Sequence, residues 1–172
     1  LCLCDKPDTP HNWQLFGDNH KGAVLQFGVI PEGGGFIDEP LKVQYQTTRP
    51  QVSSLKEQVS SLIGQAEVIP QDSFMEKVVI KSRDLTLERE WRCIKLLNEN
   101  ELDPDEEEDE WFNDYEFSAV ELSRVYLGAQ IRKKDKDEIL AILKQRYKRT
   151  KVFQAHLAIN EYAISLEPLS GE

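Results

Sequence analysis

The sequence predicts an α+β fold, a single domain over residues 1–172 in which helices pack on a mixed, mostly antiparallel sheet. Segments that alternate between apolar and polar residues with period two, as strands do, recur along the chain. Between them lie segments whose apolar residues follow helical spacing. A chain of 172 residues is long enough for one hydrophobic core, and its composition is that of an ordinary globular protein.

The predicted strands begin with the apolar residues 1–4. Residues 23–28 follow, and apolar side chains on both sides of this segment indicate a central strand. In residues 41–46, Leu41, Val43 and Tyr45 share one face. The remaining predicted strands are residues 90–97, residues 122–131, and a closing antiparallel hairpin of residues 152–158 and 161–167.

The predicted helices are less regular at their starts. Asn12 is expected to cap a short helical turn that carries Trp13 and Phe16. A longer helix is expected to open at Arg49-Pro50, and residues 72–82 form a shorter one. Residues 134–149 form an amphipathic helix, with acidic residues at its start and basic residues at its end, as the helix dipole favours.

One segment carries most of the net charge. The formal charge is −10, but residues 99–116 contain eleven carboxylates and no Lys or Arg, so the rest of the chain is close to neutral. We predict a solvated loop, because like charges at this density repel one another. The alternative is a docking site, in which residues 101–110 bind a basic protein partner or a divalent cation. The near-neutral remainder argues against non-specific nucleic-acid binding.

The three cysteines are expected to be reduced thiols. Three is an odd number, and no spacing of Cys2, Cys4, Cys93 and His11 matches a known metal-ligand pattern, so no metal is expected. Reduced thiols indicate a cytoplasmic protein. No apolar run is long enough to span a bilayer, and no membrane association is expected. The apolar start suggests that an upstream segment precedes residue 1.

The stretch from Asn12 to Phe27 reads NWQLFGDNHKGAVLQF and precedes a predicted strand. A structural helix–turn–strand needs its aromatic residues and Gly22, but not Asp18 and His20 beside them. An imidazole near a carboxylate can act as an acid, a base or a hydrogen-bond donor, which indicates a site. The alternative is structural: His20 is a loop histidine tied to Asp18, and Trp13 fills the core.

The second unusual stretch is LEREWRC, residues 87–93. In an extended chain, Glu88, Glu90 and Arg92 project to one side of the strand. Two carboxylates and a guanidinium on one face are unusual here, because the other predicted strands are apolar. If these groups are buried, they must be paired. If they lie on an exposed edge, they are ordinary surface charges.

Together these segments, with LKVQYQTTRP, LSRVYLGAQI and VFQAHLAINEYAISLEPL, resemble a bacterial family known as domain of unknown function 2971. The family motifs combine Trp, Asp-x-His-x-Gly, a Val-x-Tyr strand and Glu-x-Glu-Trp-Arg. The matching positions are Trp13, Asp18, His20, Gly22, Tyr45, Glu88, Glu90, Trp91 and Arg92. This chain departs from the family at Asn12, Leu15 and Phe16. It also lacks the family's N-terminal portion, which implies that it is the C-terminal part of a longer domain.

Two hypotheses for function follow from these residues. In the first, the chain is a nucleotide-handling enzyme similar to ADP-ribosyltransferases, acting on NAD in stress or phage defence. Glu90 would stabilise positive charge at the sugar carbon, and Glu88 would orient the acceptor. His20 or Trp13 would contact the ligand, and Asp18 and Arg92 would complete the site.

The second hypothesis is a non-catalytic binding or regulatory module that docks a protein partner. On this hypothesis Glu-Arg-Glu-Trp-Arg is a structural ion-pair strand, and the acidic residues 101–110 engage the partner. Both hypotheses share one geometric prediction. Trp13, Asp18 and His20 are expected to meet Glu88, Glu90 and Arg92 in one concave site, because each group supplies the donors or acceptors that the other lacks.

Overall fold

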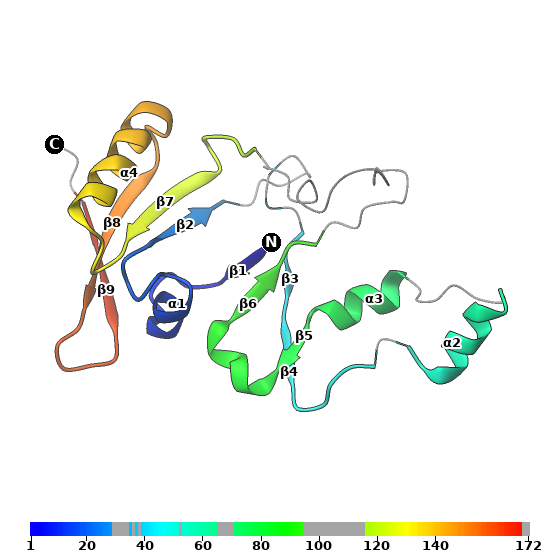
Figure 1. Ribbon diagram of the computed structural model, residues 1–172. Coiled ribbons are helices and arrows are strands. Elements are labelled where there is room, and N and C mark those ends of the chain that lie inside the picture. Colours follow the sequence, from blue (N-terminus) through cyan, green and yellow to red (C-terminus); the bar gives the residue numbers. More distant parts are fainter. Residues whose placement is uncertain are drawn as a thin grey trace. The chain divides into compact units, whose positions relative to one another are not determined.

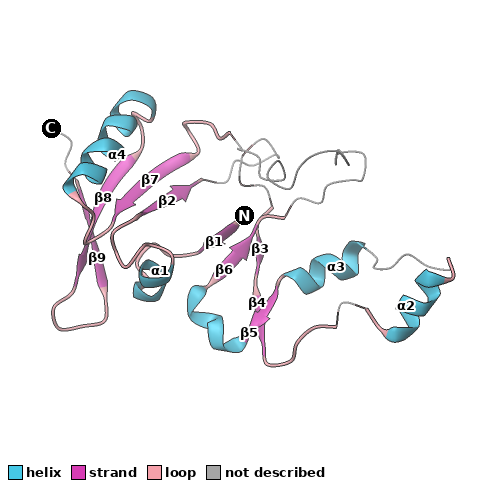
Figure 2. Ribbon diagram, in the orientation of Figure 1, coloured by secondary structure: helices cyan, strands magenta, loops and turns pink. Residues whose placement is uncertain are grey.

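The computed structural model describes residues 1–28, 35, 37, 39–51, 53–64, 71–94 and 116–169 (Figure 1). Helix and strand each account for 29% of the described residues, and the sheets are mixed and mostly antiparallel, so the predicted α+β class is confirmed (Figure 2). The chain divides into two compact units, each described separately below. The first unit contains Leu1–Asp5 and Leu41–Arg92, and the second contains Lys6–Pro40 and Cys93–Glu172.

The first unit is built on a three-stranded antiparallel sheet whose middle strand carries the Glu-Trp-Arg motif. Its strands in order are β1 (Cys2–Cys4), β6 (Glu90–Arg92) and β3 (Leu41–Lys42). A parallel pair adjoins it along the chain, formed by β4 (Gln44–Gln46) and β5 (Ile80–Ser82). The helices of this unit are α2 (Leu55–Leu62), α3 (Gln71–Val78) and the 3₁₀ helix η1 (Arg83–Glu88).

The single strand predicted for residues 41–46 is two strands. The backbone N–H of buried Val43 donates to the Glu90 carbonyl at 3.0 Å, and the N–H of Gln44 donates to the Val79 carbonyl at 2.8 Å. The chain therefore changes its partner from β6 to β5 at this point. Alternation of apolar residues continues through the change, which is why the sequence alone does not reveal it.

The second unit is a four-stranded sheet with one helix against each face. Its strand order is β2 (Ala23–Phe27), β7 (Leu122–Leu127), β8 (Lys151–Leu157) and β9 (Ile164–Pro168). The strands β7 and β8 are parallel and α4 (Lys133–Arg146) connects them, whereas the other two pairs are antiparallel. The predicted closing hairpin is confirmed as β8 and β9.

The prediction that residues 23–28 form a central strand is wrong, because β2 lies at the end of the strand order. The strand is apolar on both sides because both faces of the sheet are covered. Val24 packs with Trp13 of α1 (Pro10–Leu15) and with Tyr126, whereas Ala23 and Phe27 pack on the other face with Val125 and α4. The buried middle strand is β7, with Val125, Tyr126 and Leu127 at most 2% exposed.

Several helix boundaries differ from the predicted ones. The cap of α1 is Thr9, and Pro10 occupies the first turn, where its missing N–H costs nothing. Helix α2 begins at Leu55 instead of near residue 50. The predicted helix over residues 72–82 ends at Val78, and β5 follows. The cap of α4 is Arg132, and Lys133 and Lys134 follow it. The helix therefore begins with three basic residues, although acidic residues were expected at its start.

The last differences concern the end of strand β6 and the acidic segment that follows it in the sequence. Strand β6 ends at Arg92 in the described part of the chain, and most of the acidic tract, including residues 101–110, lies outside the described residues. None of the helices in the described ranges is long and apolar enough to cross a membrane.

Candidate functional site

The motif that begins at Asn12 forms a tight turn between α1 and β2. Asp18, Asn19 and His20 all adopt left-handed backbone conformations, with φ of 47°, 51° and 67°. A left-handed conformation is unfavourable for residues other than glycine, so the turn must be held by its surroundings. Backbone hydrogen bonds from Gly22 and Lys21 to the Gly17 carbonyl, at 2.9 and 3.0 Å, close it.

The end of β7 holds this turn from outside. The N–H of Gly128 donates to the Gly22 carbonyl at 2.9 Å, and the N–H of Gln130 donates to the His20 carbonyl at 2.8 Å. A Cβ atom on Gly128 would lie 2.2 Å from the His20 carbonyl oxygen, and one on Gly17 would lie 2.7 Å from the Trp13 carbonyl oxygen. These glycines are therefore required by close backbone contact.

Trp13 belongs to the core of the second unit. Its side chain is 1% exposed, and its indole N–H donates to the Pro7 carbonyl at 2.6 Å. The ring stacks on the His20 imidazole, with centroids 6.4 Å apart and planes 13° apart. Trp13 thus supports the turn from beneath, as the structural interpretation of this motif predicted.

His20 is half-buried, and its Nδ1 atom is buried without a hydrogen-bond partner in the described structure. Asp18 is exposed, and within the described residues no hydrogen bond or ion pair joins its carboxylate to His20. The predicted pairing of these two side chains is therefore absent, because the left-handed turn presents them differently. Asp18 instead lines a pocket.

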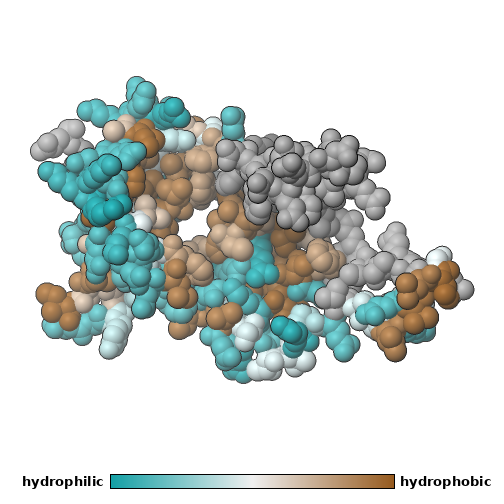
Figure 3. Space-filling view, in the orientation of Figure 1, coloured by the Kyte–Doolittle hydropathy of each residue, from teal (hydrophilic) through white to brown (hydrophobic). Residues whose placement is uncertain are grey.

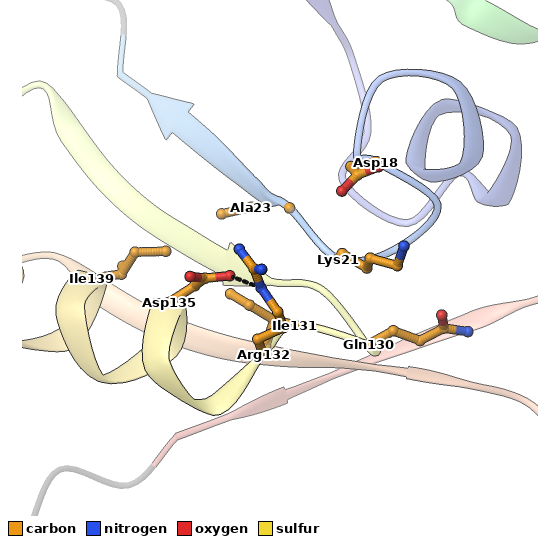
Figure 4. A pocket seen from close by; sticks show the side chains of 9 residues that line it. Asp18, Lys21, Ala23, Gln130, Ile131, Arg132, Asp135 and Ile139 are labelled. Atoms are coloured by element: carbon orange, nitrogen blue, oxygen red, sulfur yellow. Dashed lines mark hydrogen bonds and ion pairs between the residues drawn. The ribbon is translucent and has the colours of Figure 1, made fainter.

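This pocket has a volume of about 450 Å³ and lies between the turn and the start of α4 (Figure 4). The turn and β2 contribute Asp18, Lys21, Gly22 and Ala23, and the segment after β7 contributes Gln130, Ile131, Arg132, Asp135 and Ile139. Two backbone segments thus form it, and both are held by the Gly128 contacts. A pocket of this volume is in the range of small-ligand sites.

The pocket brings together charged groups of both signs, Asp18, Lys21, Arg132 and Asp135, which keep unused hydrogen-bonding atoms. The Nε atom of Arg132 donates to Asp135 at 2.7 Å, and no interaction of its Nη atoms with a described residue is found. In Figure 4 the guanidinium group rises between Ala23 and Lys21, on the side where Asp18 lies. Asp135 and nearby Asp18 raise the pKa of Arg132. Neither Asp18 nor Lys21 has a side-chain partner among the described residues.

The Glu-x-Glu motif of the first unit has the opposite character. Glu88 and Glu90 are 7% and 6% exposed. Glu90 Oε1 accepts a hydrogen bond from Arg92 Nε at 2.8 Å, and Glu90 Oε2 accepts from Lys81 Nζ at 2.8 Å and from Arg92 Nη2 at 3.3 Å. Lys81 also forms an ion pair with Glu88, and Arg92 donates to the Val78 carbonyl. Both Glu90 oxygens are therefore occupied by cations.

The protonation of this cluster follows from its contacts. Burial raises the pKa of Glu90, but hydrogen bonds from Arg92, Lys81 and Cys2 outweigh it and lower the pKa to about 2. Burial lowers the pKa of Lys81, but its bonds to Glu88 and Glu90 outweigh this and raise it. The hydrogen bond to Glu90 raises the pKa of Arg92. Glu90, Lys81 and Arg92 are consequently all charged at neutral pH.

The predicted extended run from Glu88 to Arg92 is only partly correct. Glu90 and Arg92 share one face of β6, as the alternation of a strand requires. Glu88, however, is the last residue of η1, and Arg89, between Glu88 and Glu90, has a left-handed backbone with φ of 51°. Sequence reasoning missed Lys81, which joins the two carboxylates from β5. The position of Lys81 directly after the apolar residues of the segment VVIKS could have indicated that this lysine is paired with an acidic residue.

Arg132 and Lys21 were also missed. Arg132 opens a helix with Lys133 and Lys134, where the positive end of the dipole disfavours cations. This mismatch was the available signal. The first group of predicted site residues lies in the second unit and the Glu-x-Glu group lies in the first, so their meeting in one cleft stays a prediction.

Among the described residues, no group of three or more His, Cys, Asp or Glu side chains is placed to hold a metal ion. Comparisons with protein-family models, with curated proteins and with solved structures find no match for the chain. Its resemblance to the domain of unknown function 2971 family therefore stays a prediction from the motifs.

Proposed function

We propose that this chain is a non-catalytic binding module that takes a small anionic ligand, a nucleotide, in the pocket between the 17–22 turn and α4. The observation that carries the proposal is the set of charged side chains there that keep unused hydrogen-bonding atoms. Arg132 uses only Nε within the protein, and Lys21 and Asp18 have no side-chain partner among the described residues. A ligand with complementary groups supplies the missing partners.

The chemistry of the lining fits a nucleotide. A phosphate group binds the Arg132 guanidinium, which donates from a planar fork, and the Lys21 ammonium adds a second charge. Asp18 accepts a hydrogen bond from a sugar hydroxyl. Ile131, Ile139 and Ala23 offer apolar surface for a base. The strained turn keeps Asp18 in place before the ligand arrives, which lowers the ordering cost of binding.

The enzymatic hypothesis receives less support from Glu90. A carboxylate that stabilises a developing sugar cation needs an oxygen directed at the ligand. Both Glu90 oxygens already accept hydrogen bonds from Arg92 and Lys81, and Glu90 is 6% exposed. We therefore favour the binding module over an ADP-ribosyltransferase that uses NAD.

Direct titration tests the proposal. AMP, NAD and inorganic phosphate are titrated calorimetrically into the protein and into the Lys21→Ala and Lys134→Ala variants. We expect both nucleotides to bind more tightly than phosphate, and Lys21→Ala to weaken binding by about threefold to tenfold, as loss of one partly exposed charge contact does. Lys134→Ala is the control, because it lies in α4 but outside the pocket.

Two results would reject the proposal: no nucleotide binding up to ~1 mM, the weak end of specific affinities, or equal binding by the two lysine variants. Incubation with labelled NAD and cell extract distinguishes the enzymatic hypothesis from the binding module. The enzymatic hypothesis requires NAD cleavage or label transfer, and the binding module requires neither.

Docking of a basic protein partner by residues 101–110 stays a second proposal, supported by the charge of that segment. Replacing residues 105–110 with serine and glycine is expected to abolish a partner interaction at low salt, because exposed charges dominate it. We also propose a cytoplasmic location, which the free thiols of Cys2, Cys4 and Cys93 support.

A further inference from the structure

A basic surface lies at one end of the four-stranded sheet of the second unit. Residues 144–151, which join the end of α4 to the start of β8, contain five cationic side chains and no carboxylate. The register of β7 with β8 places Arg124 directly beside Lys151. All six cations are exposed, and Figure 3 shows hydrophilic side chains gathered over α4. This basic patch consists of Arg124, Lys144, Arg146, Lys148, Arg149 and Lys151.

The fold brings these side chains together. Because β7 and β8 are parallel and α4 connects them, the end of α4 returns to the edge of the sheet where both strands begin (Figure 1). The turn before β8 is fixed at this edge. The N–H of Thr150 donates to the Tyr147 carbonyl at 3.0 Å, and the Thr150 hydroxyl donates to the Leu122 carbonyl at 2.6 Å. An ordered backbone therefore carries the patch.

The cations of the basic patch have no counter-charge within the described residues. No ion pair or side-chain hydrogen bond joins any of them to a described residue. Glu121, which precedes β7, is 3% exposed, and its carboxylate accepts a hydrogen bond from the Ser118 N–H at 2.6 Å. Cations in the last turn of a helix complement its dipole, which explains Lys144 and Arg146 but not the other four. An anion that contacts several of these cations at once is stabilised by their combined field.

We propose that the basic patch binds the phosphate backbone of a single-stranded nucleic acid. Surfaces for such strands combine cations with aromatic rings. Here the guanidinium carbon of Arg124 lies 5.7 Å from the centre of the Phe153 ring, and the half-buried Tyr147 ring stacks on Phe117 with centres 5.8 Å apart. Three of the six cations are arginines, whose planar forks match phosphate oxygens. The patch lies at the opposite end of α4 from the nucleotide pocket, so this proposal does not depend on that pocket.

Other polyanions fit the patch less well. A helix that binds an anionic membrane surface inserts a free apolar face, but α4 packs Ile139, Leu140 and Leu143 in the core. An acidic protein segment needs the cations but has no bases to stack on aromatic rings. The near-neutral charge outside the acidic segment describes only an average, because the cations are concentrated at one end of this sheet.

Fluorescence anisotropy of a labelled oligo-dT strand, titrated with the full chain, tests this proposal. With about four phosphate contacts, the affinity is expected to fall roughly fiftyfold between ~50 and ~200 mM salt, because counterions are released on binding. A Lys148→Gln and Arg149→Gln double variant is expected to weaken binding roughly tenfold at ~50 mM salt and to make the salt dependence shallower. Lys133→Gln with Lys134→Gln removes the same charge at the other end of α4 and is expected to bind like the wild type.

Four results would each overturn the proposal. The first is no binding at ~100 µM protein in ~50 mM salt, the weak end of non-specific affinities. The second is equal binding by the two double variants, both verified as folded by circular dichroism. The third is binding of polyglutamate or of phosphatidylserine vesicles as tightly as oligo-dT at equal charge. The fourth is binding only after residues 105–110 are replaced with serine and glycine, which would make the chain's own acidic segment the occupant.

Discussion

Glu90 and Asp18 are both carboxylates supplied by conspicuous sequence motifs, but their surroundings differ. Glu90 is 6% exposed and accepts hydrogen bonds from Arg92 and Lys81, which lower its pKa to about 2. Asp18 is exposed on a strained turn and lines a pocket with Lys21 and Arg132, and its carboxylate has no hydrogen bond or ion pair within the described residues. The comparison teaches that an unusual polar motif has two physical explanations. A motif whose charges are paired internally stabilises the fold, and one whose charges are unpaired is available to a ligand.

The largest expected effect is on the paired cluster. Glu90→Gln leaves Arg92 and Lys81 without the buried negative charge they share, so the free energy of unfolding is expected to fall by about 3–5 kcal/mol. Urea denaturation measures this change. Glu161→Gln, on the exposed β8–β9 turn, is the control and is expected to change stability by less than about 0.5 kcal/mol. Equal stability of the two variants would show that the Glu90 cluster contributes nothing.

Acid titration of stability sharpens the same point. Glu90 has a folded pKa of about 2 against an ordinary value of 4.5. Because the folded pKa is depressed, its stabilisation is present above the unfolded pKa and is lost as pH falls from about 4.5 toward 2. The upper bound on this loss is roughly 3 kcal/mol. Denaturation midpoints of wild type and Glu90→Gln should converge over this interval, and a constant difference would contradict the assignment.

The support of the pocket turn is tested by a glycine substitution. Gly128→Ala places a Cβ atom 2.2 Å from the His20 carbonyl oxygen, and backbone cannot yield as a flexible side chain can. We expect a loss of about 2–3 kcal/mol in the free energy of unfolding and weaker nucleotide binding, because the turn must shift. Gly28→Ala is the matched control, since its nearest contact would be an ordinary 3.9 Å. Both variants are measured by thermal unfolding, and equal losses would remove this role from Gly128.

Much of the fold was predictable because periodicity reports burial. The closing hairpin, the strand around Val125 and the body of α4 follow directly from it. Periodicity does not report partners. Periodicity therefore predicted one strand over residues 41–46, although the backbone changes its hydrogen-bonding partner from β6 to β5 after Val43. It also predicted that β2 is a central strand, although β2 is an outer strand with both faces covered.

The candidate site was predictable in part for a related reason. Asp18 and the Glu90–Arg92 pair were found because polar residues were conspicuous in apolar surroundings. Lys81 reaches Glu88 and Glu90 from β5, and Arg132 reaches the Asp18 turn from the start of α4, and local sequence does not encode such contacts. Lys21 lies in the same turn as Asp18 and could have been found there. The left-handed residues 18–20 were equally hidden, because their conformation depends on contacts from Gly128.

The central claim is that charged side chains with unused hydrogen-bonding atoms mark the binding site, and that charged side chains whose atoms are all paired mark the scaffold. One experiment compares Arg132→Ala with Glu90→Gln, measuring both melting temperature and AMP affinity. The ion pair of Arg132 is exposed to solvent and contributes little to stability, so its loss should barely change the melting temperature while weakening AMP binding about tenfold. Glu90→Gln should lower the melting temperature and leave the affinity of the folded protein unchanged. If instead Glu90→Gln abolishes AMP binding at an unchanged melting temperature, and Arg132→Ala does not, the account is contradicted.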